Sequence, residues 1–202
     1  MKKIMIMAML TVGFTGVSYA GGMNNSDMQN DKASLVGAWI NPSVNPDLQR
    51  ITWKAIGALK DYDAYGLAQL VHPKIDLRFS AEAYLNKDNV KMSKDQLPDF
   101  FRDKKEYSWA KDMAGEPVKA TPLAYYKRYI YPIDFIAFEQ QFNKMEGIGN
   151  VLEFYPGAQT ALFEYPGTEA MGYHDSRMLR LVFVEQSGKL YLAAIVYCEP
   201  EI

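Results

Sequence analysis

Apolar residues recur at helical spacing early in the chain and at alternate positions later on. Between Asp47 and His72 they are spaced three and four residues apart, which is typical of amphipathic helices: Leu48, Ile51, Ala55, Leu59, Ala64, Leu67, Ala68 and Val71. The pattern predicts two helices or one kinked helix, with a break at residues 61–63, where an Asp can cap a new helix. Pro73 ends the second helix, and the period then changes to two over residues 75–80, which predicts a strand.

Two shorter helices are predicted in the middle of the chain. Residues 93–96 read Ser-Lys-Asp-Gln, the spacing of a capping box, and the apolar stripe of Leu97, Phe100 and Phe101 follows. Thr121 and Pro122 supply a cap and a first-turn proline for another helix that runs to about Tyr131.

The rest of the chain predicts a sheet. Five β-rich segments follow one another, at residues 133–142, 151–155, 160–165, 177–185 and 190–198. The connections between them are short and rich in Gly and Pro, which requires antiparallel neighbours. The last two segments are apolar at successive positions, so we expect them to form a hairpin at the centre of the sheet. The fold class is α+β, with N-terminal helices packed on a mostly antiparallel sheet.

The first 33 residues read as a processing signal and a leader. Lys2 and Lys3 precede a short apolar run that stops at Ser18-Tyr19-Ala20, which is typical of a secretory signal peptide cleaved after Ala20. An uncleaved membrane anchor is the alternative, although the run is shorter than the roughly 20 residues that a spanning helix needs. We therefore expect a signal peptide over 1–20, a flexible leader over 21–33 and one α+β domain over 34–202, exported to the periplasm or the exterior with no membrane span after cleavage.

Composition narrows the classes of partner. The 202 residues contain 22 Lys and Arg against 24 Asp and Glu, and removal of the signal peptide makes the balance more acidic. This charge, without a basic cluster, argues against nucleic acid as a partner. Cys198 is the single cysteine, which excludes an intramolecular disulfide, and we read it as a small hydrophobic residue near a strand end. No dinucleotide, phosphate-loop or GxSxG motif is present, so no cofactor is expected, and the oligomeric state is left open.

Two resemblances bear on the fold. The order of two helices, a strand, further helices and a meander of strands resembles the nuclear-transport-factor-2-like folds, also called SnoaL-like, in which a curved sheet forms a cone around helices and leaves a pocket at its open end. Cystatin-like folds share part of this order. The resemblance implies a cone-shaped architecture for residues 47–198.

The second resemblance is one of short sequence motifs. Leu70-Val71-His72-Pro73, Leu77-Arg78-Phe79-Ser80, Ala83-Tyr84, Tyr155-Pro156 and the run from Leu179 to Phe183 resemble an uncharacterised family of exported bacterial proteins with the pattern LVHPxxGVRFSPYAY. The chain departs from that pattern at Asp76, where glycine is usual, and at Ala81-Glu82, where Pro-Tyr is usual. The resemblance implies export but no activity.

Charged residues inside predicted strands are the first candidates for a site. Arg180 lies in a strand that is apolar on both faces, and an unpaired buried charge costs several kcal/mol, so it must meet a carboxylate or a wet cavity. Arg78 raises the same question, with Glu153 and Glu164 as possible partners. A structural ion pair and a charged ligand pocket are both open.

Aromatic residues are the second candidates. Tyr107 and Trp109 alternate on one strand face, and Tyr125, Tyr126 and Tyr129 crowd one helix. Such spacing is typical of a core, although the same rings could stack on sugars. The candidate ligand-binding residues are Arg78, Tyr84, Trp109, Glu153 and Arg180.

Two functional hypotheses follow, with a purely structural envelope role as a third. The favoured one is a non-catalytic module that binds a small molecule or a cell-envelope component. The alternative is a cofactor-free SnoaL-like enzyme in which Asp134, Glu153, His174 or Asp175 does acid/base work, provided that these residues converge in one pocket. Adjacent strand residues point to opposite faces, so His174 and Asp175 would not naturally touch, and a polar turn explains them as well.

The two histidines do not predict a metal site. They are far apart in the sequence, and no HxH or HExxH spacing is present. His72 follows a helix, and the helix dipole is enough to explain an imidazole there.

Overall fold

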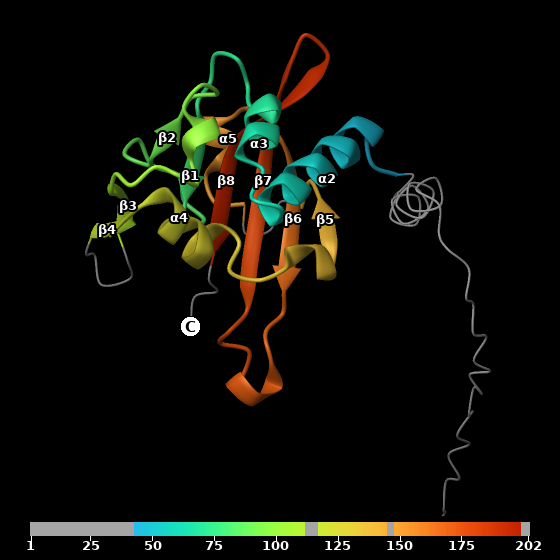
Figure 1. The fold of residues 1–202 in the computed structure, drawn as a ribbon. Helices are drawn as coiled ribbons and strands as arrows, with labels where there is room; N and C mark the ends of the chain where they lie inside the picture. Colours follow the sequence, from blue (N-terminus) through green and yellow to red (C-terminus); the bar gives the residue numbers. More distant parts are fainter. Residues whose placement is uncertain (1–42, 112–116, 145–147, 199–202) are drawn as a thin grey trace, which may run out of the picture. The chain divides into compact units, whose positions relative to one another are not determined.

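The computed structural model describes residues 43–111, 117–144 and 148–198 (Figure 1), and every structural statement below concerns this part of the chain. The predicted signal peptide, the leader and the first residues of the predicted domain lie outside the described residues. No helix within the described ranges is long and apolar enough to cross a membrane.

Two helices open the described part, as the sequence predicts. Helix α2 (Pro46–Lys60) begins at Asn45, whose side chain accepts a hydrogen bond from the Asp47 amide, and helix α3 (Ala64–Leu70) begins at Asp63, whose side chain accepts one from the Gly66 amide. Between them Tyr62 has φ = 57°, a left-handed conformation that favours glycine. For a residue with a Cβ this conformation costs about 1–2 kcal/mol.

The main sheet has six strands in the order β2-β1-β8-β7-β6-β5. Their bounds are Leu77–Ser80 for β1, Lys91–Met92 for β2, Gln140–Phe142 for β5, Gln159–Tyr165 for β6, Arg177–Gln186 for β7 and Lys189–Cys198 for β8. All these neighbours pair antiparallel except β1 and β8, which are parallel with Arg78 opposite Ala194. The β7–β8 hairpin occupies the two central positions, which confirms the prediction.

The hairpin turn is set by its two central residues. Gln186 pairs with Lys189, and Ser187 and Gly188 both have positive φ, which matches the twist of the flanking strands. The register shifts by one residue between Val182 and Phe183, so that Ala193 is an extra residue in β8. Backbone placement confirms Cys198 at the end of a strand, whereas its side chain lies outside the described part.

Smaller elements complete the domain. Strands β3 (Tyr107–Lys111) and β4 (Pro117–Ala120) form a separate two-stranded sheet. The capping box is confirmed, because the Ser93 and Gln96 side chains each accept a hydrogen bond from the other residue's amide, and it precedes the 3-10 helix η1 (Leu97–Asp99). Thr121 caps helix α4 (Pro122–Tyr125), which continues as a π-helix, η2 (Tyr126–Ile130). A further 3-10 helix, η4 (Glu169–Met171), lies between β6 and β7.

Two predicted strands are corrected. Residues 151–155 form helix α5 (Val151–Phe154), because Val151 and Tyr155 are four residues apart and both buried, a spacing that suits a helix as well as alternation suits a strand. Within 133–142 only β5 is a strand, and a 3-10 helix, η3 (Phe135–Ala137), precedes it. Pro132 cannot donate to a sheet ladder at the start of that segment.

The sheet has two unlike faces. The helical face carries Leu179, Leu181 and Phe183 of β7 and packs against α2, α3 and the α4–η2 segment in one large core. The other face, here called the α5 face, carries Val182, Ala194 and Val196, which pack with Val151 and Tyr155 and with Leu85 from the loop after β1. The α+β class with helices packed on a mostly antiparallel sheet is therefore confirmed.

Candidate functional site

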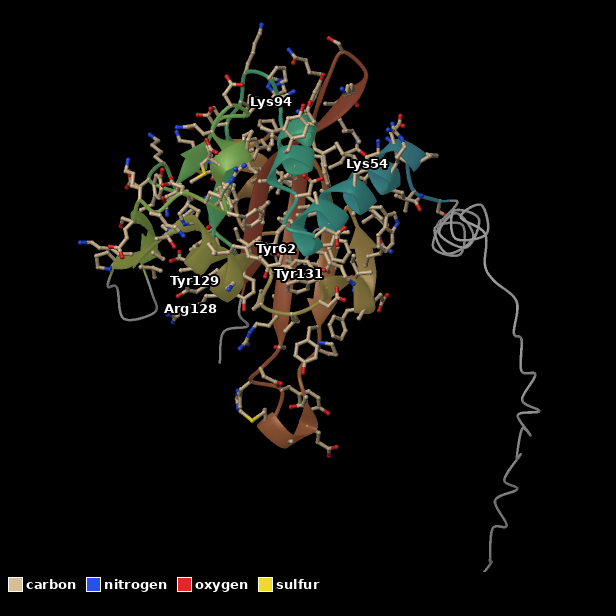
Figure 2. All side chains as sticks on the ribbon, viewed as in Figure 1. Lys54, Tyr62, Lys94, Arg128, Tyr129 and Tyr131 are labelled. Carbon is tan, nitrogen blue, oxygen red and sulfur yellow. The ribbon has the colours of Figure 1, made fainter. Side chains whose placement is uncertain are left out.

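A groove opens where the first turns of α2, the end of α3 and the β7–β8 turn meet. Its volume is about 250 Å³. Cavities that hold ligands span roughly 300–1,000 Å³, so this groove suits a small one. It is lined by Asp47, Arg50, Ile51, Lys54, Gln69, Leu70, Gly188, Lys189, Leu190 and Tyr191. Figure 2 labels Lys54 on α2 and shows its side chain projecting from the helix.

The walls of the groove combine an apolar floor with a cationic rim. Ile51 and Leu190 are buried and Leu70 is half-buried, whereas Arg50, Lys54 and Lys189 are exposed. Asp47 is the one acidic residue of the lining, and its carboxylate accepts a hydrogen bond from Arg50 at 2.6 Å. The rim therefore keeps an excess of positive charge in a chain whose net charge is −2.

Local sequence fixes the walls. The α2 cap at Asn45 sets where Asp47 and Arg50 begin the first turn, and the Ser187-Gly188 turn places Lys189 at the rim. The end of α3 is tied to β8 by an isolated parallel bridge between Val71 and Leu192. The Lys189 ammonium lies 4.9 Å from the centre of the Tyr191 ring, a cation–π distance that holds it over the groove wall.

His72 follows the end of α3, as expected, and is buried beside this region. Its Nδ1 accepts a hydrogen bond from the Lys74 amide at 2.9 Å, and its ring meets the Tyr191 ring edge-on at 5.2 Å. Among the described residues no group of three or more His, Cys, Asp or Glu side chains is placed to hold a metal ion.

The predicted site residues do not line this groove. Arg78 lies on the α5 face, where its guanidinium donates to the Tyr155 hydroxyl at 3.2 Å and to the Asn86 carbonyl and lies 4.9 Å from the centre of the Phe154 ring. These contacts join β1, the following loop and α5. The guanidinium of Arg78 therefore makes its described contacts within the domain.

Tyr84 and Glu153 come from the same region as Arg78. Tyr84 is 63% exposed in the loop after β1, and Glu153 is exposed on α5 between Leu152 and Phe154. That loop is pinned to α5 by Asn150, whose side chain accepts from the Leu85 amide at 2.7 Å and donates to the Leu85 carbonyl at 2.9 Å. The structure brings the three segments together, but within the described ranges no hydrogen bond or ion pair joins Arg78 to Glu153.

Arg180 is buried on the α5 face, with 3% of its surface exposed. Its guanidinium donates to the Lys144 carbonyl at 2.7 Å and to the Thr160 hydroxyl at 3.3 Å. Glu164, one expected partner, accepts instead from Lys144 and from Gln141, each at 3.5 Å. Glu153, the other expected partner, lies on helix α5 rather than on a neighbouring strand.

Trp109 is fully buried in the core of the helical face. Its ring stacks on Tyr125 with centroids 4.0 Å apart and planes 7° apart, and its indole N–H donates to the Ala120 carbonyl at 2.8 Å. The buried Tyr125 hydroxyl has no hydrogen-bond partner among the described residues, and burial raises its pKa far above the usual range. Trp109 therefore acts as a core residue with no exposed face for a ligand.

The four acid/base candidates do not assemble into one pocket. Asp134 accepts from the Lys60 ammonium and the Tyr131 hydroxyl, whereas Asp175 accepts from the Thr168 amide and the Tyr165 hydroxyl. The Lys60 hydrogen bond lowers the pKa of Asp134, and the Thr168 amide lowers that of Asp175. A lowered pKa keeps a carboxylate ionised, which is opposite to what a general acid needs near neutral pH.

The other two candidates are exposed and separate. His174 lies in the turn between β6 and β7, and Glu153 lies on α5. No hydrogen bond of the described residues joins any two of the four. Asp175 instead holds the 166–176 turn closed, as the polar-turn interpretation expected.

The groove is not predicted from the sequence. Arg50 and Lys54 are four residues apart and so share one helix face, which was a visible signal. Lys189 follows a recognised turn, but only the fold brings that turn to α2. Residues distant in sequence therefore make the rim.

Comparisons with known proteins found similarity to solved structures. No protein-family model matches the sequence, and no curated protein does. A candidate calcium/calmodulin dependent protein kinase II association domain from Xanthomonas campestris is 10% identical with a TM-score of 0.34, over 81% of this chain and 94% of the other. An NTF-2 like protein of unknown function from Shewanella oneidensis MR-1 is 12% identical with a TM-score of 0.29, over 75% and 96%.

A third solved structure, a protein of unknown function from Mycobacterium tuberculosis, is 10% identical with a TM-score of 0.29, over 90% of this chain and 79% of the other. At these identities and TM-scores no functional residue is transferred from any of the three.

Proposed function

We propose that this protein is an exported, non-catalytic binding module of the bacterial cell envelope, and that it binds a small anionic ligand with an apolar part in the groove between α2, α3 and the β7–β8 turn. The observation that carries the proposal is the pairing of a cationic rim with an apolar floor. Arg50, Lys54 and Lys189 attract an anion, and Ile51 and Leu190 offer apolar surface to the rest of the ligand.

The position of α2 adds to this attraction. The first turn of the helix lies at the groove, and the N-terminus of a helix carries a partial positive charge. The surplus positive charge is local, since the chain as a whole is mildly acidic. An anion would therefore be drawn to this groove rather than to the surface in general.

A matched pair of probes tests the charge requirement. Octanoate and octanamide have nearly the same shape and differ in charge, and we expect octanoate to bind more tightly in titration calorimetry, with an advantage that shrinks as salt is added. Equal binding of the two probes, or binding of neither, would reject the proposal.

Charge reversal on the rim locates the site. Lys54→Glu and Lys189→Glu should each weaken octanoate binding about tenfold or more, since each replaces an attraction with a repulsion. Lys104→Glu changes the same charge at an exposed lysine that does not line the groove, and it should leave binding unchanged. If all three variants weakened binding alike, net charge rather than the groove would be responsible.

Export has its own support and its own test. The support is the charged start, apolar run and small-residue stop of residues 1–20, together with the resemblance of residues 70–84 to exported proteins. Expression of the full sequence in a bacterium should give a mature chain beginning at Gly21. Ala20→Tyr should block that cleavage, and a wild-type chain that kept Met1 in the soluble envelope fraction would contradict the proposal.

A further inference from the structure

Four aromatic side chains meet beneath the end of α2, away from the groove. Tyr62 lies with its ring centre 5.2 Å from that of Phe101 and 4.9 Å from that of Tyr126, and the Tyr126 and Tyr131 rings are parallel within 8° at 6.2 Å. We call Tyr62, Phe101, Tyr126 and Tyr131 the tyrosine platform. None of them lines the groove, and Figure 2 labels Tyr62 and Tyr131 together below α2.

The backbone of Tyr62 is held in an unfavourable conformation at this position. The residue ends α2 in the left-handed region, where the Asp63 amide bonds back to the Ala58 carbonyl at 2.8 Å, an arrangement that glycine would make without strain. Tyr62 is nevertheless 48% exposed as a residue, so the strained backbone is not offset by full burial. A strained residue that keeps its ring in solvent points to a role for that ring outside the fold.

A second irregularity lies against the first. Residues Tyr126–Ile130 form a π-helix, closed by the Tyr131 amide bonding to the Tyr126 carbonyl at 2.9 Å. Single π-turns inside helices are rare and are frequent at functional sites. This one sets the positions of Tyr126 and Tyr131, so two uncommon backbone features converge on the same set of rings.

The platform has a polar edge. Asp134 accepts hydrogen bonds from the Tyr131 hydroxyl at 2.7 Å and from the Lys60 ammonium at 2.6 Å, and the exposed Asp61 adjoins Tyr62. Lys60 and Asp134 neutralise each other and still expose donors and acceptors, because both side chains are about half exposed. The remaining charge of Asp61 disfavours an anion.

We propose that the tyrosine platform binds a neutral saccharide strand, with the apolar face of a sugar ring stacked on Tyr62 and its hydroxyl groups bonded to the Lys60–Asp134 edge. A saccharide combines an apolar ring face with hydroxyls at its rim, and it carries no charge that would have to displace the Lys60–Asp134 pair. This complementarity distinguishes it from anionic and cationic ligands. The site is independent of the groove and of the ligand proposed there.

Substitution of Tyr62 by glycine separates binding from folding. Tyr62→Gly removes the ring and also relieves the left-handed strain, so we expect the melting temperature to stay unchanged or rise while saccharide binding falls tenfold or more. A loss of binding without a loss of stability would assign the effect to the ring and not to unfolding. Tyr65→Ala is the matched control, because Tyr65 is a neighbouring tyrosine, 66% exposed, that makes none of the ring contacts of the platform. It should bind as the wild type does.

The probes are a tetramer of β-1,4-linked N-acetylglucosamine, the corresponding free monosaccharide, a glucuronate-containing oligosaccharide and a proline-rich peptide, measured by titration calorimetry on the chain from residue 21. We expect the neutral tetramer to bind more tightly than the monosaccharide or the acidic oligosaccharide. Tighter binding of the acidic oligosaccharide or of the peptide would overturn the proposal. So would equal binding of the tetramer by the wild type and Tyr62→Gly, or no binding of the tetramer by the wild type.

Discussion

The two faces of the central hairpin differ in how they are covered. On the helical face, large side chains fill the space under α2, α3 and the α4–η2 segment, with Trp109 stacked on Tyr125 at 4.0 Å. On the α5 face, small residues such as Ala194 and Val196 meet a four-residue helix and a pinned loop, and two arginines lie in the strands. The first face is held mainly by apolar burial, and the second depends on hydrogen bonds from Arg78, Arg180 and Asn150.

One apolar strand can therefore pack against a large apolar core on one face and against a smaller, more hydrogen-bonded cluster on the other. Strand β7 is buried on both faces around its centre, yet only one face is part of the large core. On the other face Arg78 and Arg180 donate to carbonyl and hydroxyl oxygens, in keeping with the rule that buried polar groups are hydrogen-bonded.

The largest effect is expected from removing β8, because this strand supplies part of both faces. A chain truncated after Gln186 loses the partner of β1 and of β7 and should have no cooperative thermal transition by circular dichroism. A chain ending at Cys198 should melt as the full chain does. A cooperative melt of the shorter chain would contradict the central role of the hairpin.

The next effect compares one core residue from each face. Trp109→Ala should lower the free energy of unfolding by about 3–5 kcal/mol, and Val182→Ala on the α5 face by about 1–2 kcal/mol, because much less apolar surface is lost. Urea denaturation of the two variants measures both values. An equal loss of unfolding free energy in the two variants would mean that apolar burial stabilises the α5 face as much as the helical face.

A smaller effect is expected from removing the hydrogen bonds by which Asn150, at the start of α5, holds the loop after β1. Asn150→Ala removes both hydrogen bonds to Leu85 and should cost about 1–3 kcal/mol of unfolding free energy. Asn150→Asp keeps the acceptor and loses the donor, so its loss should be intermediate. If Asn150→Ala were as stable as the wild type, the α5 face would not depend on this residue.

The smallest effect concerns acid. The pKa of Asp134 is lowered, first by its hydrogen bond to Lys60 and then by the Tyr131 hydroxyl. Its contribution to stability is therefore present above the ordinary pKa of about 3.9 and is lost as pH falls through the lower folded pKa. Asp134→Asn should flatten the loss of stability below pH 4, measured by urea denaturation at several pH values, and an unchanged acid profile would exclude this carboxylate as its source.

Much of the fold follows from local signals. The caps at Asp63 and Thr121, the reciprocal pair of Ser93 and Gln96 and the turn at Ser187-Gly188 all act within a few residues, so sequence predicts them. Segment 151–155 could not be assigned in this way. Four apolar and aromatic side chains in five residues suit either a helix or a strand, and the packing of Val151 and Tyr155 with Leu85 is a contact that no local pattern predicts.

The candidate sites were less predictable. The sequence predicts Arg180 as a buried charge that needs partners, but two groups to which it donates, the Lys144 carbonyl and the Thr160 hydroxyl, carry no charge signal in a sequence. From the sequence, Trp109 suits either a core or a surface that stacks on sugars. Its burial against Tyr125, which comes from another element, identifies it as a core residue. The sequence predicts a helix break at Tyr62, but the contacts of its ring are with Phe101 and Tyr126, which lie far along the chain.

The parallel pairing of β1 with β8 has a consequence for how the chain is made. A ribosome releases Arg78 long before Ala194, its partner in the sheet, has been synthesised. Contacts between residues so far apart in sequence form late and slow folding, because a long loop must close first. Until β8 has been synthesised, the sheet lacks one of its two central strands and β1 lacks its parallel partner, so the fold cannot be completed before the last strand is made.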